Sequence, residues 1–298
     1  MIQLLHGDCL ELMKDVPDKS IDMILCDLPY GLTHCDWDIP LDMESMWKQY
    51  KRIIKDHGAI LLFSIQPFTT DLIQSNRKMF RYEIIWQKTQ PLGFLNANKM
   101  PLKTHENILV FYKHLPTYNP IKRRIEEEEA KERGINVGRK RIKKANRCVL
   151  YGNVKEQDYV DDGTRYPCDV IKFSNWNGSL FGNVDKVTKH PTQKPVPLLE
   201  YLIKTYTNEG DTVLDNCMGS GSTSVACVNL KRNFIGIELE EEYFKIAEER
   251  INNARLNQQT GGFKPSSRFA AGRSNNESIA HSECKADERR PAGRRKDI

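Results

Sequence analysis

The chain has 298 residues, of which 39% are hydrophobic and 29% charged, and its formal net charge is +5. Its longest apolar runs, such as residues 59–63, are far too short to cross a bilayer, and residues 1–17 carry acidic groups where a secretory leader needs an apolar core. We therefore expect a cytoplasmic protein without a membrane segment. The eight cysteines include no C-x-x-C pair, which is typical of reduced packing cysteines and predicts no metal site.

Strands alternate with helices in the first part of the chain. Short buried strands are predicted at residues 2–6, 21–26, 59–64, 82–87 and 107–113. Helices are predicted between them, at residues 10–14, 43–55 and 68–78. Such alternation indicates an α/β fold, with a doubly wound and mostly parallel sheet.

This pattern breaks at residue 115 and returns after residue 188. The intervening segment is polar, charged and rich in Tyr, Asn and Gly, with a stretch at 126–133 that is charged enough for a solvated helix. Beyond it we expect a helix at 197–206, a strand at 212–215, a helix at 222–229, a strand at 234–238 and a helix at 241–253. The sequence thus predicts a core made of residues 1–114 and 189–255, an insertion at 115–188 and a disordered basic tail at 256–298.

Positive charge gathers in the insertion and the tail. Residues 113–189 hold seventeen basic and eleven acidic side chains, and residues 256–298 hold nine and five. The rest of the chain is net acidic, so the insertion is the expected contact for a polyanion.

A glycine-bearing turn between a predicted strand and a predicted helix favours a cofactor site. Residues 213–223 read Val-Leu-Asp-Asn-Cys-Met-Gly-Ser-Gly-Ser-Thr, which brings two glycines to the start of a helix, where free N–H groups accumulate. Glu238 ends the next strand, where a carboxylate suits the two hydroxyls of a ribose. An ordinary strand–turn–helix connection with a surface glutamate is the alternative.

A second motif suits chemistry on an amino group. Asp27-Leu28-Pro29-Tyr30 follows a buried strand, at the edge where open α/β sheets bind ligands. An aromatic amine is a poor nucleophile, and a carboxylate with a backbone carbonyl can hold both its protons and aim its lone pair at a methyl donor. Pro29 stiffens the turn so that the carbonyl of Leu28 points inward, and Tyr30 offers a face for base stacking. A tight turn after a strand is the alternative.

Together these segments resemble the amino-group DNA methyltransferases. Asp27-Leu28-Pro29-Tyr30 is similar to their Asp-Pro-Pro-Tyr catalytic motif, and residues 215–221 resemble their Asp-Pro-Phe-x-Gly-Ser-Gly cofactor loop. The motif order, catalytic first and cofactor loop late, is that of the β group. Leu28 replaces a proline but keeps its carbonyl, whereas Cys217 replaces a phenylalanine and changes the packing expected beside the cofactor's adenine.

Other segments match the family in the same order. Gly7-Asp8-Cys9 resembles its adenine-side acidic residue, residues 82–88 and Thr104-His105-Glu106 match signatures before the variable region, and the segment from His190 to Pro195 matches one before the cofactor loop. The resemblance implies a Rossmann-like methyltransferase core whose first half is catalytic and whose second half binds S-adenosylmethionine. The implied cofactor residues are Asp8, Lys194, Asp215, Gly219, Gly221, Ser222, Thr223 and Glu238.

By the same resemblance, the insertion would recognise the DNA target. Residues 139–147 carry six basic side chains and no acidic one, which are Arg139, Lys140, Arg141, Lys143, Lys144 and Arg147. A solvated charged face is the alternative for this stretch. Aromatic residues nearby could stack on DNA or form the insertion's own core, and they are Tyr151, Tyr159, Tyr166 and Trp176.

The sequence therefore predicts a DNA methyltransferase that moves a methyl group from S-adenosylmethionine to N6 of an adenine flipped out of duplex DNA, without a metal. N4-cytosine methylation is the nearest alternative, although an aspartate at position 27 is more typical of the adenine enzymes. A catalytically inactive DNA-binding module and a methyltransferase acting on RNA or protein are further alternatives. A homodimer and a cognate restriction nuclease are the protein partners compatible with this interpretation.

Overall fold

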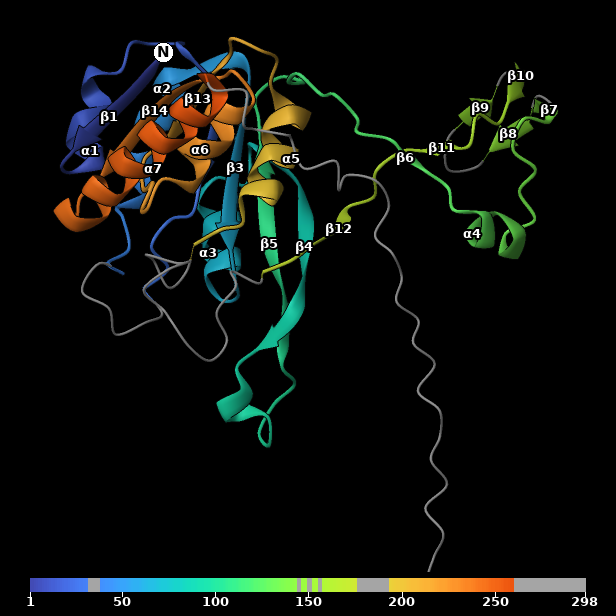
Figure 1. Ribbon diagram of the computed structural model, residues 1–298, viewed down its shortest axis with the longest axis horizontal. Coiled ribbons are helices and arrows are strands. Elements are labelled where there is room, and N and C mark those ends of the chain that lie inside the picture. The colour runs from blue at the N-terminus through green and yellow to red at the C-terminus, as the bar shows by residue number, and fades with distance from the viewer. Residues whose placement is uncertain (32–37, 144–145, 149–151, 155–156, 176–192, 260–298) are drawn as a thin grey trace, which may run out of the picture.

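The computed structural model describes residues 1–31, 38–143, 146–148, 152–154, 157–175 and 193–259, and its centre is an eight-stranded sheet (Figure 1). The sheet order is β1-β14-β13-β2-β3-β5-β4-β12. These strands are β1 (Ile2–His6), β2 (Ile21–Cys26), β3 (Ile54–Ser64), β4 (Phe80–Leu92), β5 (Lys103–Phe111), β12 (Val170–Phe173), β13 (Thr212–Asp215) and β14 (Asn233–Glu238).

Seven of the eight strands run in the same direction, and β5 alone is reversed. All neighbouring pairs are parallel except β3 with β5 and β4 with β5. The carboxyl ends of the seven strands consequently share one edge of the sheet with the amino end of β5. We call this edge the carboxyl edge, and the site described below lies along it.

Helices cover both faces of the sheet, which confirms the doubly wound α/β fold. The helices of the core are α1 (Cys9–Leu12), α2 (Met43–Ile53), α3 (Phe68–Ser75), α5 (Val196–Tyr206), α6 (Ser222–Asn229) and α7 (Glu241–Gln259). Successive residues of β2 supply the two cores in turn: Ile24 and Cys26 pack with α1, α2 and α3, whereas Met23 and Leu25 pack with α5, α6 and α7. This alternation is what the pleat of a strand buried on both faces produces.

The predicted core elements are all present, with shifts at their ends. The helix expected at 43–55 ends at Ile53, since Ile54 already begins β3, whose eleven residues include five that the apolar pattern missed. The helix expected at 241–253 runs on to Gln259, so the first four residues assigned to a disordered tail are helical. Ala254 is buried beside Ile251 and Val228, which extends the packed face of α7 beyond the predicted end.

Residues 115–175 leave the core and return to it. Their elements are β6 (Arg123–Arg124), α4 (Glu127–Glu132), β7 (Lys140–Lys143), β8 (Asn146–Cys148), β9 (Gly152–Val154), β10 (Gln157–Val160) and β11 (Thr164–Arg165), which lie to one side of the sheet in Figure 1. The chain then rejoins the sheet as β12, which pairs with β4. The predicted insertion thus contributes an edge strand to the core, and its boundary at residue 188 stays a prediction.

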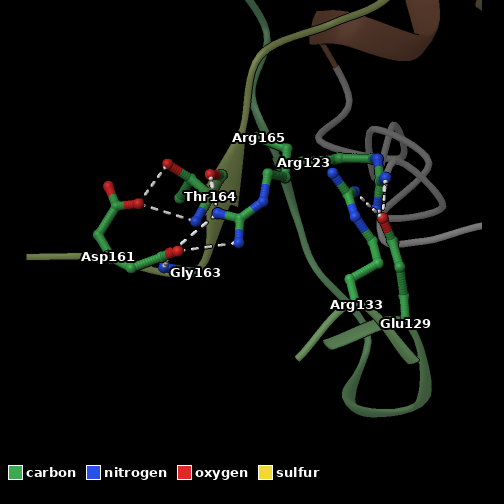
Figure 2. A network of polar contacts seen from close by, with 8 residues as sticks. Arg123, Glu129, Arg133, Asp161, Gly163, Thr164 and Arg165 are labelled. Carbon is green, nitrogen blue, oxygen red and sulfur yellow. Dashed lines mark hydrogen bonds and ion pairs between the residues drawn. The ribbon is translucent and has the colours of Figure 1, made fainter. Parts of the chain in front are cut away.

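Two groups of ion pairs lie within this region (Figure 2). Glu129 of α4 accepts from both terminal nitrogens of Arg123 at 2.6 and 2.8 Å and from Arg133 at 2.8 Å, and these two arginines lower the pKa of Glu129 to about 2. Asp161 accepts two hydrogen bonds from Arg165, at 2.9 and 3.0 Å. These arginines are therefore already engaged within the protein.

A search for membrane-spanning helices among the described residues found no helix with the length and apolar character that a span requires.

Candidate active site

A single cavity of about 640 Å³ runs along the carboxyl edge and is lined by both predicted motifs. Residues 27–30, which follow β2, lie on its wall together with Glu238 at the end of β14. Because β2, β13 and β14 are neighbours in the sheet, their carboxyl ends open into the same space. The cavity also takes in Asp8, Lys194, Asp215, Gly219, Ser222 and Thr223, so it brings together every predicted cofactor residue except Gly221.

Asp215 fixes the turn between β13 and α6. Its Oδ2 accepts from the Thr223 hydroxyl at 2.6 Å, and its Oδ1 accepts from the Cys217 backbone N–H at 3.2 Å. Burial raises the pKa of this carboxyl to about 7, against the opposing effect of those hydrogen bonds. Asp215 and Thr223 therefore stabilise the shape of the loop, and direct contact of either residue with a cofactor stays a prediction.

Gly221 allows this loop to pass close to α7. Its φ is +77°, and an added Cβ would lie 2.8 Å from the Cβ of Ala247 and 2.9 Å from the Ser224 hydroxyl. Both the backbone conformation and the lack of space therefore require glycine. Arg250 of α7 adds a contact that sequence reasoning missed, because it donates to the Ser220 carbonyl at 2.6 Å and to the Ser222 hydroxyl at 3.3 Å.

Glu238 holds the other side of the cofactor loop. Its Oε2 accepts from the Gly219 N–H at 2.7 Å and its Oε1 from the Glu240 N–H at 2.9 Å, and burial raises its pKa. Each carboxylate oxygen keeps a second lone pair for a ligand. Asp8 caps α1 by accepting from Leu10 at 2.7 Å, and the pairing of β1 with β14 sets it at the same end of the cavity.

Cys9, Asn216 and Cys217 form a packed polar group on the cavity wall beside the cofactor loop. The Asn216 amide lies 3.5 Å from both sulfur atoms, and its carbonyl accepts from the buried Tyr50 hydroxyl at 2.5 Å. Cys217, where the family usually has phenylalanine, thus contacts the Asn216 amide and lines the cavity.

Asp27 and Tyr30 are joined within the catalytic motif. The Tyr30 hydroxyl donates to Asp27 Oδ1 at 2.5 Å, and its ring lies 5.0 Å from that of Phe68. Asp38 stabilises the turn that carries the motif, because its Oδ1 accepts from the backbone N–H groups of Tyr30 and Gly31 at 2.7 and 2.9 Å. Sequence reasoning missed Asp38, which no local pattern marks. Leu28 is buried in the core and Pro29 is partly exposed.

Lys194 lies on the catalytic side of the cavity. Its ammonium pairs with Asp27 Oδ2, lies 3.5 Å from Glu106 Oε2 and sits 5.1 Å above the Phe63 ring. Burial opposes its charge, but the two carboxylates outweigh burial and raise the pKa of Lys194. The predicted role in cofactor binding stays a prediction. Lys88, which pairs with Glu106, and Glu106 itself were missed as site residues, although both fall in segments that resemble the family.

The basic stretch lies outside the cavity. Lys140 forms an exposed ion pair with Asp158 at 2.8 Å, and Arg139 is exposed beside it. Arg141 and Lys143 lie on β7 and Arg147 on β8, while Lys144, Tyr151, Trp176 and His190 fall outside the described residues. The predicted contact of this stretch with DNA therefore stays a prediction.

The burial of Asp215 predicts a pH dependence of stability. Its folded pKa of about 7 exceeds the ordinary value of 3.8, so the folded state binds more protons between these values and this group's contribution to stability falls as pH rises through that window. Chemical unfolding of wild type and Asp215→Asn at pH 5 and pH 8 should show the variant gaining about 2 kcal/mol relative to wild type at the higher pH. An equal difference at both pH values would contradict a buried, proton-binding Asp215.

Comparison with known proteins places the chain among DNA methylases. The N6/N4 methyltransferase family, described as DNA methylase, matches residues 21–249. The type II methyltransferase M2.DpnII of Streptococcus pneumoniae is 31% identical, over 83% of this chain and 88% of its own length. The DNA adenine methyltransferase YhdJ of Escherichia coli (strain K12) is 27% identical, over 84% of this chain and 83% of its own.

Solved structures agree with this fold. The crystal structure of the M1.HpyAVI–SAM complex is 28% identical, covers 85% of this chain and 100% of its own, and superposes with a TM-score of 0.56. The PvuII cytosine-N4-specific DNA methyltransferase, at 16% identity and a TM-score of 0.55, covers 87% of this chain and 93% of its own and shares the fold. Since the family match spans most of the chain and includes both motifs that line the cavity, this protein belongs to the N6/N4 family of DNA methylases.

Proposed function

We propose that this protein transfers the methyl group of S-adenosylmethionine to N6 of adenine in double-stranded DNA. The observation that carries the proposal is the shared cavity, in which Asp27 and Tyr30 face the same space as Glu238 and the cofactor loop. The adenine assignment is supported by the aspartate at position 27 and by the adenine methyltransferase among the relatives. The M1.HpyAVI–SAM complex supports the cofactor.

The residues of the cofactor side fit S-adenosylmethionine. Glu238 offers carboxylate oxygens that are oriented by two backbone N–H groups and retain lone pairs for ribose hydroxyls. Gly221 leaves no side chain between the loop and α7, and the start of α6 borders the cavity at Ser222 and Thr223. The bound cofactor would supply an electrophilic methyl group on a positively charged sulfur.

On the catalytic side, Asp27 would accept one N–H of the target amine and the Leu28 carbonyl would accept the other. These two acceptors favour a pyramidal nitrogen whose lone pair forms the new N–C bond, while the electron pair of the broken C–S bond stays on sulfur. The nitrogen then carries one proton too many, and Asp27 is the acceptor that we propose for it. The ring of Tyr30 would stack on the base, which must leave the duplex to enter the cavity.

The identity of the methylated base tests this proposal directly. Purified protein, S-adenosylmethionine and duplex DNA should yield N6-methyladenine on mass spectrometry of the digested DNA. N4-methylcytosine in its place would overturn the adenine assignment and keep the mechanism. Absence of any methylated base, in a protein that binds both DNA and cofactor, would favour an inactive DNA-binding module.

We further propose that the basic stretch 139–147 contacts phosphates of the DNA. The logarithm of the DNA-binding constant falls linearly with the logarithm of the salt concentration. Arg139→Ala should make this slope shallower by about one unit, because one phosphate contact is lost. Lys140→Ala should change the slope less, since Asp158 already neutralises that ammonium. Lys245→Ala is the matched control, because Lys245 is exposed and paired with Glu241 on α7. Unchanged slopes for Arg139→Ala and Lys140→Ala would place the phosphate contacts elsewhere.

The protein partners expected from the sequence belong to the same proposal. The type II names of several relatives support a role beside a cognate restriction nuclease. A homodimer is the other predicted assembly, and sedimentation of the purified protein with and without DNA would determine the number of copies.

A further inference from the structure

Four buried or partly buried charges form a line from β4 to the catalytic motif. Lys88 near the end of β4 pairs with Glu106 near the start of β5, Glu106 lies 3.5 Å from Lys194, and Lys194 pairs with Asp27. The reversed direction of β5 is what brings Glu106 to the carboxyl edge beside the end of β4. The exposed fractions of the four side chains run from 7% for Lys88 to 27% for Asp27.

The two oxygens of Glu106 are used unequally. Oε1 accepts from Lys88, whereas Oε2 is buried, has no hydrogen-bond donor among the described residues and lies 3.5 Å from the Lys194 ammonium. Lys194 therefore interacts with both carboxylates: it donates a hydrogen bond to Asp27 and is also attracted by Glu106. The ion pair between Lys88 and Glu106 is supported by the Trp86 ring, whose centre lies 5.0 Å from the Lys88 ammonium.

We propose that Glu106, held in place by Lys88, is a positioning residue that limits how strongly Lys194 engages Asp27 and so leaves Asp27 able to accept the target amine. The inference deepens the proposed function, because it assumes that Asp27 receives that amine. Without Glu106, the Lys194 ammonium would interact with Asp27 alone. It would then compete with the target amine for the carboxylate oxygens of Asp27. Without Lys194, Asp27 would lose the cation that favours its ionised form.

The inference predicts opposite effects from two substitutions. Glu106→Gln removes a negative charge near Asp27, so the pH at which Asp27 titrates should fall. Lys194→Met removes a positive charge, so that pH should rise. Charge alone gives this pair of signs, so the positioning role itself is tested by the rate of methylation in the same variants. Among the described residues, Tyr30, Cys26 and Asp215 are further titratable groups that interact with Asp27, and both substitutions leave them in place.

The titration of Asp27 can be measured in the full chain without cofactor or DNA. Carboxyl-¹³C aspartate labelling gives a resonance for Asp27, which is assigned by its loss in Asp27→Asn. We expect the midpoint to move down in Glu106→Gln and up in Lys194→Met, each by about half a pH unit or more. Glu106→Asp, which keeps the charge, should lie between wild type and Glu106→Gln.

Glu83→Gln is the matched control, because Glu83 lies on β4 and its carboxylate accepts from Asn107 of β5 and is not part of the charged line. It should leave the midpoint unchanged. Shifts of the same sign in Glu106→Gln and Lys194→Met, or no shift in either, would overturn the inference. If Glu106→Gln does not fold, Lys88→Met gives the same decision: loss of this more distant cation should raise the midpoint, and an unchanged midpoint would overturn the inference.

Methylation kinetics separate this inference from the proposed function. In single-turnover assays at neutral pH, Glu106→Gln should methylate DNA more slowly than wild type, because Lys194 then competes with the amine for Asp27, and Glu106→Asp should retain more of the rate. If the two variants shift the Asp27 midpoint in opposite directions but the wild-type protein methylates no DNA, the influence of Glu106 and Lys194 on Asp27 is retained and the proposed function is rejected. If the wild-type protein methylates DNA but neither variant shifts the Asp27 midpoint, the proposed function is retained and the positioning role is rejected.

Discussion

Asp27→Ala is expected to lower the rate of methyl transfer by about a hundredfold or more, while S-adenosylmethionine still binds. The substitution removes the carboxylate that holds the target amine as its nitrogen becomes pyramidal, an interaction that matters most in the transition state. The fold should survive, because Lys194 keeps Glu106 as a counter-charge after Asp27 is lost. Single-turnover rates and calorimetric titration with the cofactor measure the two effects separately.

Neighbouring variants sharpen this prediction. Tyr30→Phe should be mild, because the ring remains and only the hydrogen bond to Asp27 is lost, whereas Tyr30→Ala should be severe. Asp56→Ala is the matched control, since Asp56 is an exposed aspartate paired with Lys19 and Lys113. A folded Asp27→Ala protein that methylates DNA at near the wild-type rate would exclude the mechanism.

Gly221→Arg is expected to abolish measurable binding of S-adenosylmethionine. A side chain at this position would have to displace Ala247 or Ser224, and a residue with φ of +77° is strained unless it is glycine. Gly210→Arg separates strain from position: Gly210 has a similar φ of +85°, but an added Cβ would have no atom within 4 Å. Calorimetry should therefore show loss of binding in Gly221→Arg and near wild-type affinity in Gly210→Arg.

Glu238→Ala tests the same site by a different physical route. It removes the acceptor proposed for the ribose hydroxyls and leaves the N–H groups of Gly219 and Glu240 without their partner. We expect affinity for the cofactor to fall by about tenfold or more. Unchanged affinity in both Gly221→Arg and Glu238→Ala, with the fold intact, would move the cofactor site away from this loop.

The sequence alone determined the local elements and the two motifs. The strand at Thr212–Asp215 and the helix at Ser222–Asn229 have the predicted bounds, because their apolar runs are short and end at glycine or polar residues. Each motif, the catalytic one and the cofactor loop, is a contiguous segment of the chain, and their residue types, taken together with their order, carried the resemblance to the family. Their common position followed from one rule, that parallel strands open their carboxyl ends at one edge.

Only the tertiary structure decided what surrounds Asp27. Lys194 lies 167 residues away in the chain, and Glu106 reaches the site because β5 alone runs against the other strands of the sheet. Such pairings cannot be predicted from the local sequence, because strand order and direction are determined by the packing of the whole sheet. Lys194 shows the limit: a family motif identified the residue, whereas its ion-pair partners were fixed by contacts between segments distant in sequence.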